Sequence, residues 1–249
     1  MNRIRFAGPS LIGLLIGAAF PSEAPDSASI LIRGGAFDTE RSAPAFSEEH
    51  RERLLRGRHV STHSLFISPS GQTMAERTLD FSLSPLRPDY IFKDLRNGYE
   101  EGAQAREGAI RVFFRDSAQA PLREKRLKVP EPCVVNGGMG FFIRRNWTEL
   151  AAGRKITFNM VVPARLDFYR FKAYVDPQRT LPEKEAGGRK HLAIAIEAQN
   201  SLLRMLIPVI VLYYDVGTKR MIRYQGISNV ADAKGRSLRV RIDYPGLGP

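Results

Sequence analysis

The feature that most constrains this chain is one amphipathic helix, predicted over residues 136–153, in a sequence that otherwise consists of short strand-like runs. Its apolar side chains recur at helical spacing and form one stripe: Met139, Phe142, Ile143, Trp147, Leu150 and Ala151. Asn136 can cap the start, and Gly153 can end the helix in a left-handed conformation. A lone helix among strands must bury its stripe against a sheet. We therefore expect a sheet that curves around this helix.

Strand-like runs on both sides of the helix supply the rest of the fold. The Asn97-Gly98 pair suits a tight hairpin turn between two short strands. Residues 165–175 are partly apolar on both faces, as in an interior strand, and residues 237–243 alternate apolar with charged side chains. We therefore predict a mainly β (α+β) fold: a curved antiparallel sheet or half-barrel of about ten strands wrapped around one amphipathic helix.

The N-terminal residues have the three parts of an export signal. Arg3 and Arg5 precede an apolar run over residues 11–20, which ends in small residues. This run is too short to span a bilayer, which takes roughly 20 apolar residues. We therefore expect residues 1–19 to be a signal peptide and the protein to be periplasmic; an uncleaved membrane anchor is the alternative.

The rest of the chain divides by composition into a leader and one domain. Residues 20–57 are rich in Pro, Ser and Ala and predict a flexible leader, which can lend one strand to the sheet. Within it, residues 47–56 carry acidic side chains early and basic ones late, as in a short helix. Residues 58–249 predict a single β-rich domain, because strands of the same character resume after a polar connector at 176–190.

Charge and cysteine content narrow the chemistry. The formal net charge is +12, so a basic exported protein can associate with anionic lipid headgroups or polysaccharide. The basic residues are scattered along the strands, however, so solubility alone is the other interpretation. Cys133 is the single cysteine, which leaves no internal disulfide, and its neighbours favour a small buried side chain over a nucleophile.

No residue pattern predicts a reaction, a metal or a cofactor. The sequence has neither Ser-His-Asp nor phosphate-loop spacing. His59 and His63 would lie about 13 Å apart on a strand, too far for one zinc ion. Asp94 and Glu100 flank the Asn97-Gly98 turn and are the candidate pair for acid–base hydrolysis, but solvent at a hairpin tip would keep both ionised, with Arg96 pairing with one. We therefore expect a protein that is not an enzyme.

Aromatic side chains give the best candidate binding site. We expect an apolar cavity between helix and sheet, lined by Phe141, Phe142, Trp147, Phe168, Phe171, Tyr213 and Tyr224. The alternative is that these residues fill the core completely. Phe141 lies off the helix stripe, so the helix carries more apolar surface than it needs to pack one face against the sheet.

The C-terminal hairpin adds a resemblance. Residues 213–230 are similar to a strand–loop–strand pattern of uncharacterised exported bacterial proteins. The matching positions are Tyr214, Asp215, Thr218, Arg220, Gly226, Ser228 and Asn229. The wider layout, many strands around one helix behind a signal peptide, resembles the half-barrel of the periplasmic outer-membrane lipoprotein carriers. This resemblance implies that the concave face binds an acyl chain or another apolar molecule.

We therefore expect an exported, non-enzymatic binding or carrier protein for an apolar or amphipathic ligand such as a lipid. One alternative is a basic envelope protein that contacts anionic lipid headgroups or polysaccharide at the membrane surface. Another is a hydrolase that uses Asp94 and Glu100. Export argues against a nucleic-acid partner.

Overall fold

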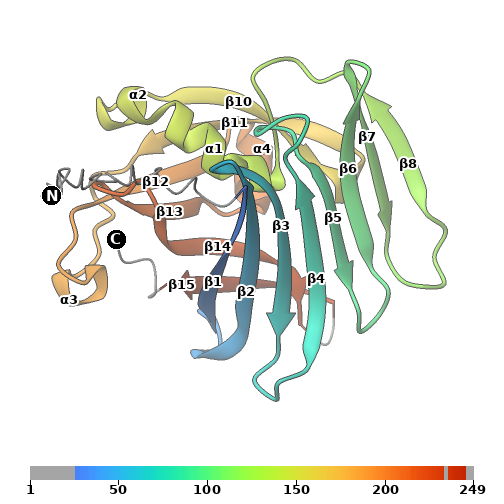
Figure 1. Ribbon diagram of the computed structural model, residues 1–249, viewed down its shortest axis with the longest axis horizontal. Coiled ribbons are helices and arrows are strands. Elements are labelled where there is room, and N and C mark those ends of the chain that lie inside the picture. Colours follow the sequence, from blue (N-terminus) through green and yellow to red (C-terminus); the bar gives the residue numbers. More distant parts are fainter. Residues whose placement is uncertain (1–25, 233–234, 245–249) are drawn as a thin grey trace, which may run out of the picture.

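A computed structural model describes residues 26–232 and 235–244, and in it fifteen strands form one continuous curved sheet (Figure 1). The strands are β1 (Ser27–Asp38), β2 (Ala43–Leu55), β3 (Arg58–Ile67), β4 (Thr73–Asp80), β5 (Asp89–Asp94), β6 (Glu100–Arg106), β7 (Ala109–Arg115), β8 (Arg123–Leu127), β9 (Cys133–Val135), β10 (Ile156–Val162), β11 (Asp167–Val175), β12 (His191–Ala198), β13 (Ile210–Asp215), β14 (Met221–Ala231) and β15 (Ser237–Asp243). The helical segments are η1 (Asn136–Gly138), α1 (Met139–Arg145), α2 (Trp147–Ala151), η2 (Pro163–Arg165), α3 (Glu183–Ala186) and α4 (Ser201–Leu206).

Two meanders make up the sheet and meet at its centre. Strands β1 to β8 follow one another in chain order on one side, and β15 back to β9 do so on the other. The halves join where Gly35–Asp38 of β1 pair antiparallel with Val240–Asp243 of β15. The neighbouring strands are antiparallel throughout, except that β9 and β10 are parallel. The predicted curved, mainly β fold is confirmed, with fifteen strands in place of about ten.

The predicted central helix is present, but it is divided in two. α1 ends at Arg145 and α2 begins at Trp147. Between them, the side-chain amide of Asn146 donates a hydrogen bond to the carbonyl of Phe142, at 2.8 Å, and Asn146 leaves helical backbone geometry. The same carbonyl also accepts the backbone N–H of Asn146, at 3.1 Å, so the side chain shares this acceptor with the helix, and the break lies in the non-helical backbone of Asn146.

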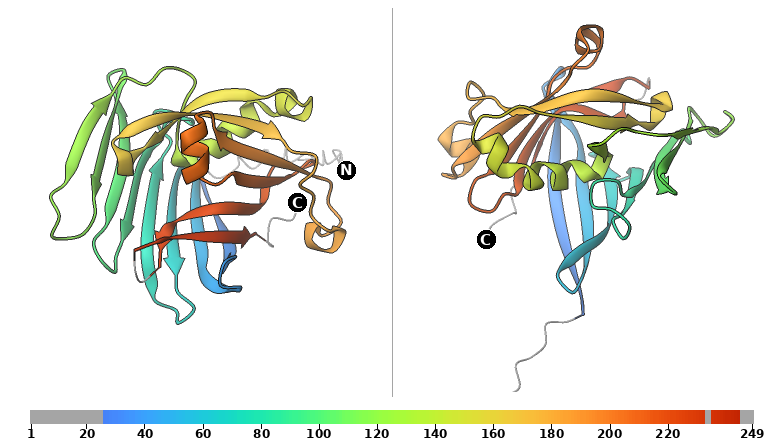
Figure 2. Two further views of the ribbon diagram at one scale, coloured as in Figure 1. Left: turned by 180° about the vertical axis from the view of Figure 1, so that it is seen from behind. Right: turned by 90° about the horizontal axis from the view of Figure 1, so that it is seen from above.

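The helix stripe packs on the half of the sheet that contains β10 to β13. Phe142, Ile143, Trp147 and Leu150 are all buried and share one core with the inner side chains of those strands: Phe158, Phe171, Ala173, Ile194, Ile196, Leu212 and Tyr214. A second core lies inside β1 to β7 and β15. Both views in Figure 2 show α1 and α2 running along β10 and β11. Among the described residues, the helices are too short or too polar to cross a bilayer.

The expected leader with a short helix is wrong for the part that the structure describes. Residues 47–56 fall almost entirely in β2, which pairs with β1 and β3 along its length. Phe46, Glu48 and His50 point inward and are buried, while Ser47 and Glu49 point outward. This two-residue period is that of a strand, and the domain therefore begins with β1. The predicted signal peptide, residues 1–19, lies outside the described residues.

Candidate functional site

Helix α1 lies between the two cores of the sheet, and its two adjacent phenylalanines pack against different cores. The Phe142 ring is 2% exposed and lies 4.6 Å from the ring of Phe158 on β10. The Phe141 ring is only partly buried and lies 5.1 Å from Phe81 and 5.8 Å from His59 of β3. Phe141 therefore extends from the helix toward the first half of the sheet, away from the stripe that packs on β10 to β13.

A groove opens beside Phe141. The segment 81–88 after β4 runs past α1, and the carbonyl of Leu86 accepts a hydrogen bond from the backbone N–H of Val135, at 3.0 Å. The groove has a volume of about 490 Å³ and is lined by Ser84, Pro85, Leu86, Arg87, Glu131, Phe141 and Arg145. Its size falls within the range of small-molecule sites.

Gly138 sets how closely α1 approaches the segment 81–88. A Cβ atom at this position would lie 2.1 Å from the carbonyl oxygen of Leu86, a distance that backbone atoms cannot accommodate. Glycine is therefore required where the chain enters α1. This close approach forms one wall of the groove.

The charged residues around the groove are not equally available. Arg87 donates a hydrogen bond to Glu131 at 2.6 Å, and the other carboxylate oxygen of Glu131 accepts the backbone N–H of Cys133 at 2.9 Å. The Arg144 guanidinium lies over the Phe141 ring, 4.9 Å from its centroid. Arg145 is exposed and has no acidic partner among the described residues. The rim of the groove is therefore positively charged.

The structure does not bring the predicted ligand-binding aromatics into one site. Phe142, Trp147 and Phe171 are buried in the core beneath the helix, Phe168 is partly exposed beside the other core, and Tyr224 is partly exposed and packs against both cores. Tyr213 belongs to a separate cluster with Leu181 and Ala186 of the 176–190 connector.

Trp147 does not border either of the two cavities identified among the described residues. Its ring is 6.0 Å from that of Tyr214, with the ammonium of Lys219 5.8 Å from its centroid, and the residue is 8% exposed. Of the predicted aromatics, Phe141 alone lines one of these cavities. Sequence reasoning missed Leu86 and Arg145, because nothing local to either residue indicates that segment 81–88 lies against α1.

A buried polar network inside β2 and β3 was also missed. His50 contacts Ser64 through Nδ1 at 2.8 Å and Glu48 through Nε2 at 2.9 Å, and the Tyr244 hydroxyl donates to Glu48 at 2.8 Å. The order Ser, His, Glu is that of a hydrolytic triad. Ser64, however, is 0% exposed, so a substrate cannot reach its hydroxyl. The network holds β2, β3 and the chain after β15 together.

The ionisation of Glu48 follows from this setting. Burial alone would raise the pKa of its carboxyl, but the hydrogen bond and charge of His50, with the charge of Arg77 and the Tyr244 hydroxyl, hold the pKa below its usual value of 4.5. The network therefore stabilises the ionised carboxylate.

A second network crosses the interior near the β5–β6 hairpin. Glu101 accepts hydrogen bonds from the hydroxyls of Tyr90 and Tyr99 at 2.5 and 2.9 Å, and from the side chain of Asn229 on β14 at 2.8 Å. Burial, followed by the adjacent Glu101 carboxylate, raises the pKa of Tyr90 well above 10. Asn229, singled out in the C-terminal pattern, thus links the two halves of the sheet.

The candidate hydrolase pair is held in ion pairs. Asp94 is 3% exposed, which corrects the expectation that solvent surrounds it, and Arg96 pairs with it at 2.5 Å as predicted. Glu100 pairs with Arg115 at 2.7 Å. Each carboxylate faces its own guanidinium, so the two do not form an acid–base pair.

The two histidines considered for a metal lie on β3 as predicted. The pairing of β3 with β2 shifts register between Arg53 and Leu54, so His59 and His63 lie on different faces of the sheet. His59 packs inward against Phe81 and bonds to Thr62 Oγ1 at 2.7 Å, whereas His63 is exposed. The described residues contain no cluster of three or more metal-binding side chains.

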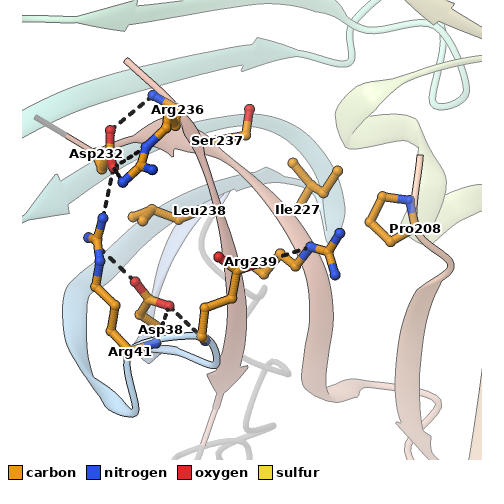
Figure 3. A pocket seen from close by; sticks show the side chains of 10 residues that line it. Asp38, Arg41, Pro208, Ile227, Asp232, Arg236, Ser237, Leu238 and Arg239 are labelled. Carbon is orange, nitrogen blue, oxygen red and sulfur yellow. Dashed lines mark hydrogen bonds and ion pairs between the residues drawn. The ribbon is translucent and has the colours of Figure 1, made fainter. Parts of the chain in front are cut away.

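The other cavity, of about 300 Å³, lies at the turns after β1 and β14 (Figure 3). Arg41 lies 2.8 Å from Asp232 and 3.6 Å from Asp38, and Arg236 lies 2.9 Å from Asp232. The remaining arginine, Arg239, pairs with Glu40 at 3.2 Å. Each arginine of this cavity has an acidic partner, so the cluster ties two turns together and carries little charge for a ligand.

Comparisons with known proteins find a likeness in structure and none in sequence. No family profile matches the sequence, and no curated protein sequence is significantly similar to it. The structure is similar to a crystal structure of a β-barrel-like protein of the domain of unknown function DUF1849 from Brucella abortus, with a TM-score of 0.45 and 9% sequence identity. The match covers 86% of this chain and 96% of that one.

Proposed function

We propose that this protein is an exported, non-enzymatic carrier that binds an apolar or amphipathic, lipid-like ligand in the groove beside α1. The observation that carries the proposal is the groove itself, about 490 Å³ in volume, with Phe141, Pro85 and Leu86 as its apolar lining. The helix stripe is packed against the sheet, so the ligand belongs beside Phe141 and not beneath Trp147. Export rests on the pattern of residues 1–19.

The energetics suit an alkyl chain. Each methylene removed from water contributes about 0.8 kcal/mol, so about ten methylenes buried against the groove would supply the roughly 8 kcal/mol of micromolar binding. The resemblance to periplasmic lipoprotein carriers supports the same ligand class. The charged side chains that line the groove, Arg87, Glu131 and Arg145, favour an amphipathic ligand over a purely apolar one.

A displacement assay tests the proposal. The purified protein is loaded with the fluorescent apolar probe N-phenyl-1-naphthylamine, which is then displaced with dodecanoate. Phe141→Ala removes on the order of 50 Å² of apolar contact and should weaken binding roughly tenfold. Leu95→Ala, at an exposed leucine on the β5–β6 turn outside the groove, is the control and should bind as the unmodified protein does. Equal affinities of the Phe141→Ala variant and the unmodified protein would contradict the proposal.

A second candidate function is peripheral contact with an anionic membrane surface. The net charge of +12 and the exposed Arg145, which has no acidic partner among the described residues, favour it. Cosedimentation with vesicles that contain phosphatidylglycerol should then fall as salt rises from low to high ionic strength. Binding that is unaffected by salt would reject this candidate.

A further inference from the structure

The charges at the groove identify the polar end of the ligand. Glu131 is the only acidic residue that lines this groove, and both of its carboxylate oxygens are engaged, one by Arg87 and the other by the backbone N–H of Cys133. Neither oxygen of Glu131 is therefore left to pair with Arg145. Arg144 is not one of the residues that line the groove, and its guanidinium lies over the Phe141 ring.

Arg145 is left as the available cation. It lines the groove from the last turn of α1, is exposed, and has no acidic partner among the residues described. A guanidinium presents a planar fork of N–H donors that matches a carboxylate with two parallel hydrogen bonds. An apolar floor with a free guanidinium at its rim is complementary to a chain that ends in one anionic group.

We propose that the groove selects a long-chain carboxylate, with the alkyl chain on Phe141 and Leu86 and the carboxylate on Arg145. This inference rests on the proposed function and adds the charge and class of the head. A single free guanidinium suits a carboxylate better than a bulky phosphodiester head, for which the groove offers no second free cation among the described residues.

Ligands with the same chain and different heads provide the test. Displacement of N-phenyl-1-naphthylamine is measured for dodecanoate, dodecanol and a lysophosphatidylglycerol whose acyl chain has the same length as dodecanoate. Dodecanoate should bind at least about tenfold more tightly than dodecanol, the gain expected for a charge-assisted hydrogen-bonded pair.

Variants then assign the preference to one residue. Arg145→Gln should remove the advantage of dodecanoate while dodecanol binds as before, and Arg145→Lys should restore part of it. Arg154→Gln removes the same charge from an exposed arginine that pairs with Glu149 at 2.8 Å, and it should keep the full preference.

The outcomes separate the two proposals. If neither dodecanoate nor dodecanol binds, the proposed function is wrong. If both bind equally to the unmodified protein, or if Arg145→Gln retains the preference, the carboxylate inference is overturned and the carrier proposal stands. Tighter binding of the lysophosphatidylglycerol than of dodecanoate also overturns the inference, in favour of a phosphodiester head.

Discussion

Replacing Glu48 by Gln should destabilise the protein by about 3 kcal/mol at neutral pH. Glu48 is 6% exposed and accepts hydrogen bonds from His50 at 2.9 Å and Tyr244 at 2.8 Å. Hydrogen bonds to a charged group each contribute about 1.5–3 kcal/mol, and removing one member of a buried charged network costs about 3–5 kcal/mol. Gln keeps the size and loses the charge, so we expect the lower end of that range.

The pH dependence follows from the lowered pKa of Glu48. A carboxyl whose pKa is lower in the folded state than its usual 4.5 contributes stability that is present above pH 4.5 and is lost as the pH falls through the folded-state value. The difference between the unmodified protein and Glu48→Gln should therefore be full at neutral pH and shrink below pH 4.5.

Urea unfolding, followed by the fluorescence of the single tryptophan, Trp147, measures both effects. Glu49→Gln is the matched control: the neighbouring carboxylate points outward and pairs with Arg33, whose side chain is 69% exposed, so its loss should cost less than about 1 kcal/mol. Equal losses for the two variants, or a Glu48→Gln deficit that persists unchanged below pH 4, would refute the reasoning.

Further predictions concern the approach of α1 to the sheet and the link between the two halves. Gly138→Ala should destabilise the protein by about 2 kcal/mol, because its Cβ would lie 2.1 Å from the Leu86 carbonyl oxygen. Gly140→Ala, whose Cβ would meet only the end of the Arg144 side chain at 3.4 Å, should instead be neutral or stabilising by up to about 1 kcal/mol, and thermal unfolding distinguishes the two. Asn229→Ala should cost about 1–2 kcal/mol in urea unfolding, because it leaves Glu101 without a partner from β14, and no loss would show that this bridge is unimportant.

The helix could be predicted from sequence because its stripe is local. The spacing of Phe142, Ile143 and Trp147 was enough to place it and to identify its buried face. Its break was not predictable from that spacing, since it depends on the backbone conformation that Asn146 adopts. A hairpin at Asn97-Gly98 was also confirmed, but its loop covers residues 95–99 and is wider than the tight turn that the pair predicts.

The strands that sequence reasoning missed lack an apolar alternation. On β2 the buried positions include Glu48 and His50, so the inner face is not marked by hydrophobic side chains. Their charges instead resembled those of a helix with acidic residues first.

The candidate site could be predicted only in part, because its walls come from distant parts of the chain. Phe141 was recognised from its position off the helix stripe. Leu86 reaches α1 through its backbone pairing with Val135, and the freedom of Arg145 depends on the separate engagement of Glu131. Neither relation can be read from local spacing.

A crystal structure of the protein soaked or grown with dodecanoate tests the central claim most directly. The account predicts an alkyl chain lying between Phe141 and Leu86, with its carboxylate within hydrogen-bonding distance of the Arg145 guanidinium. A chain found between α2 and the sheet beside Trp147, or an empty groove at saturating ligand, would contradict it.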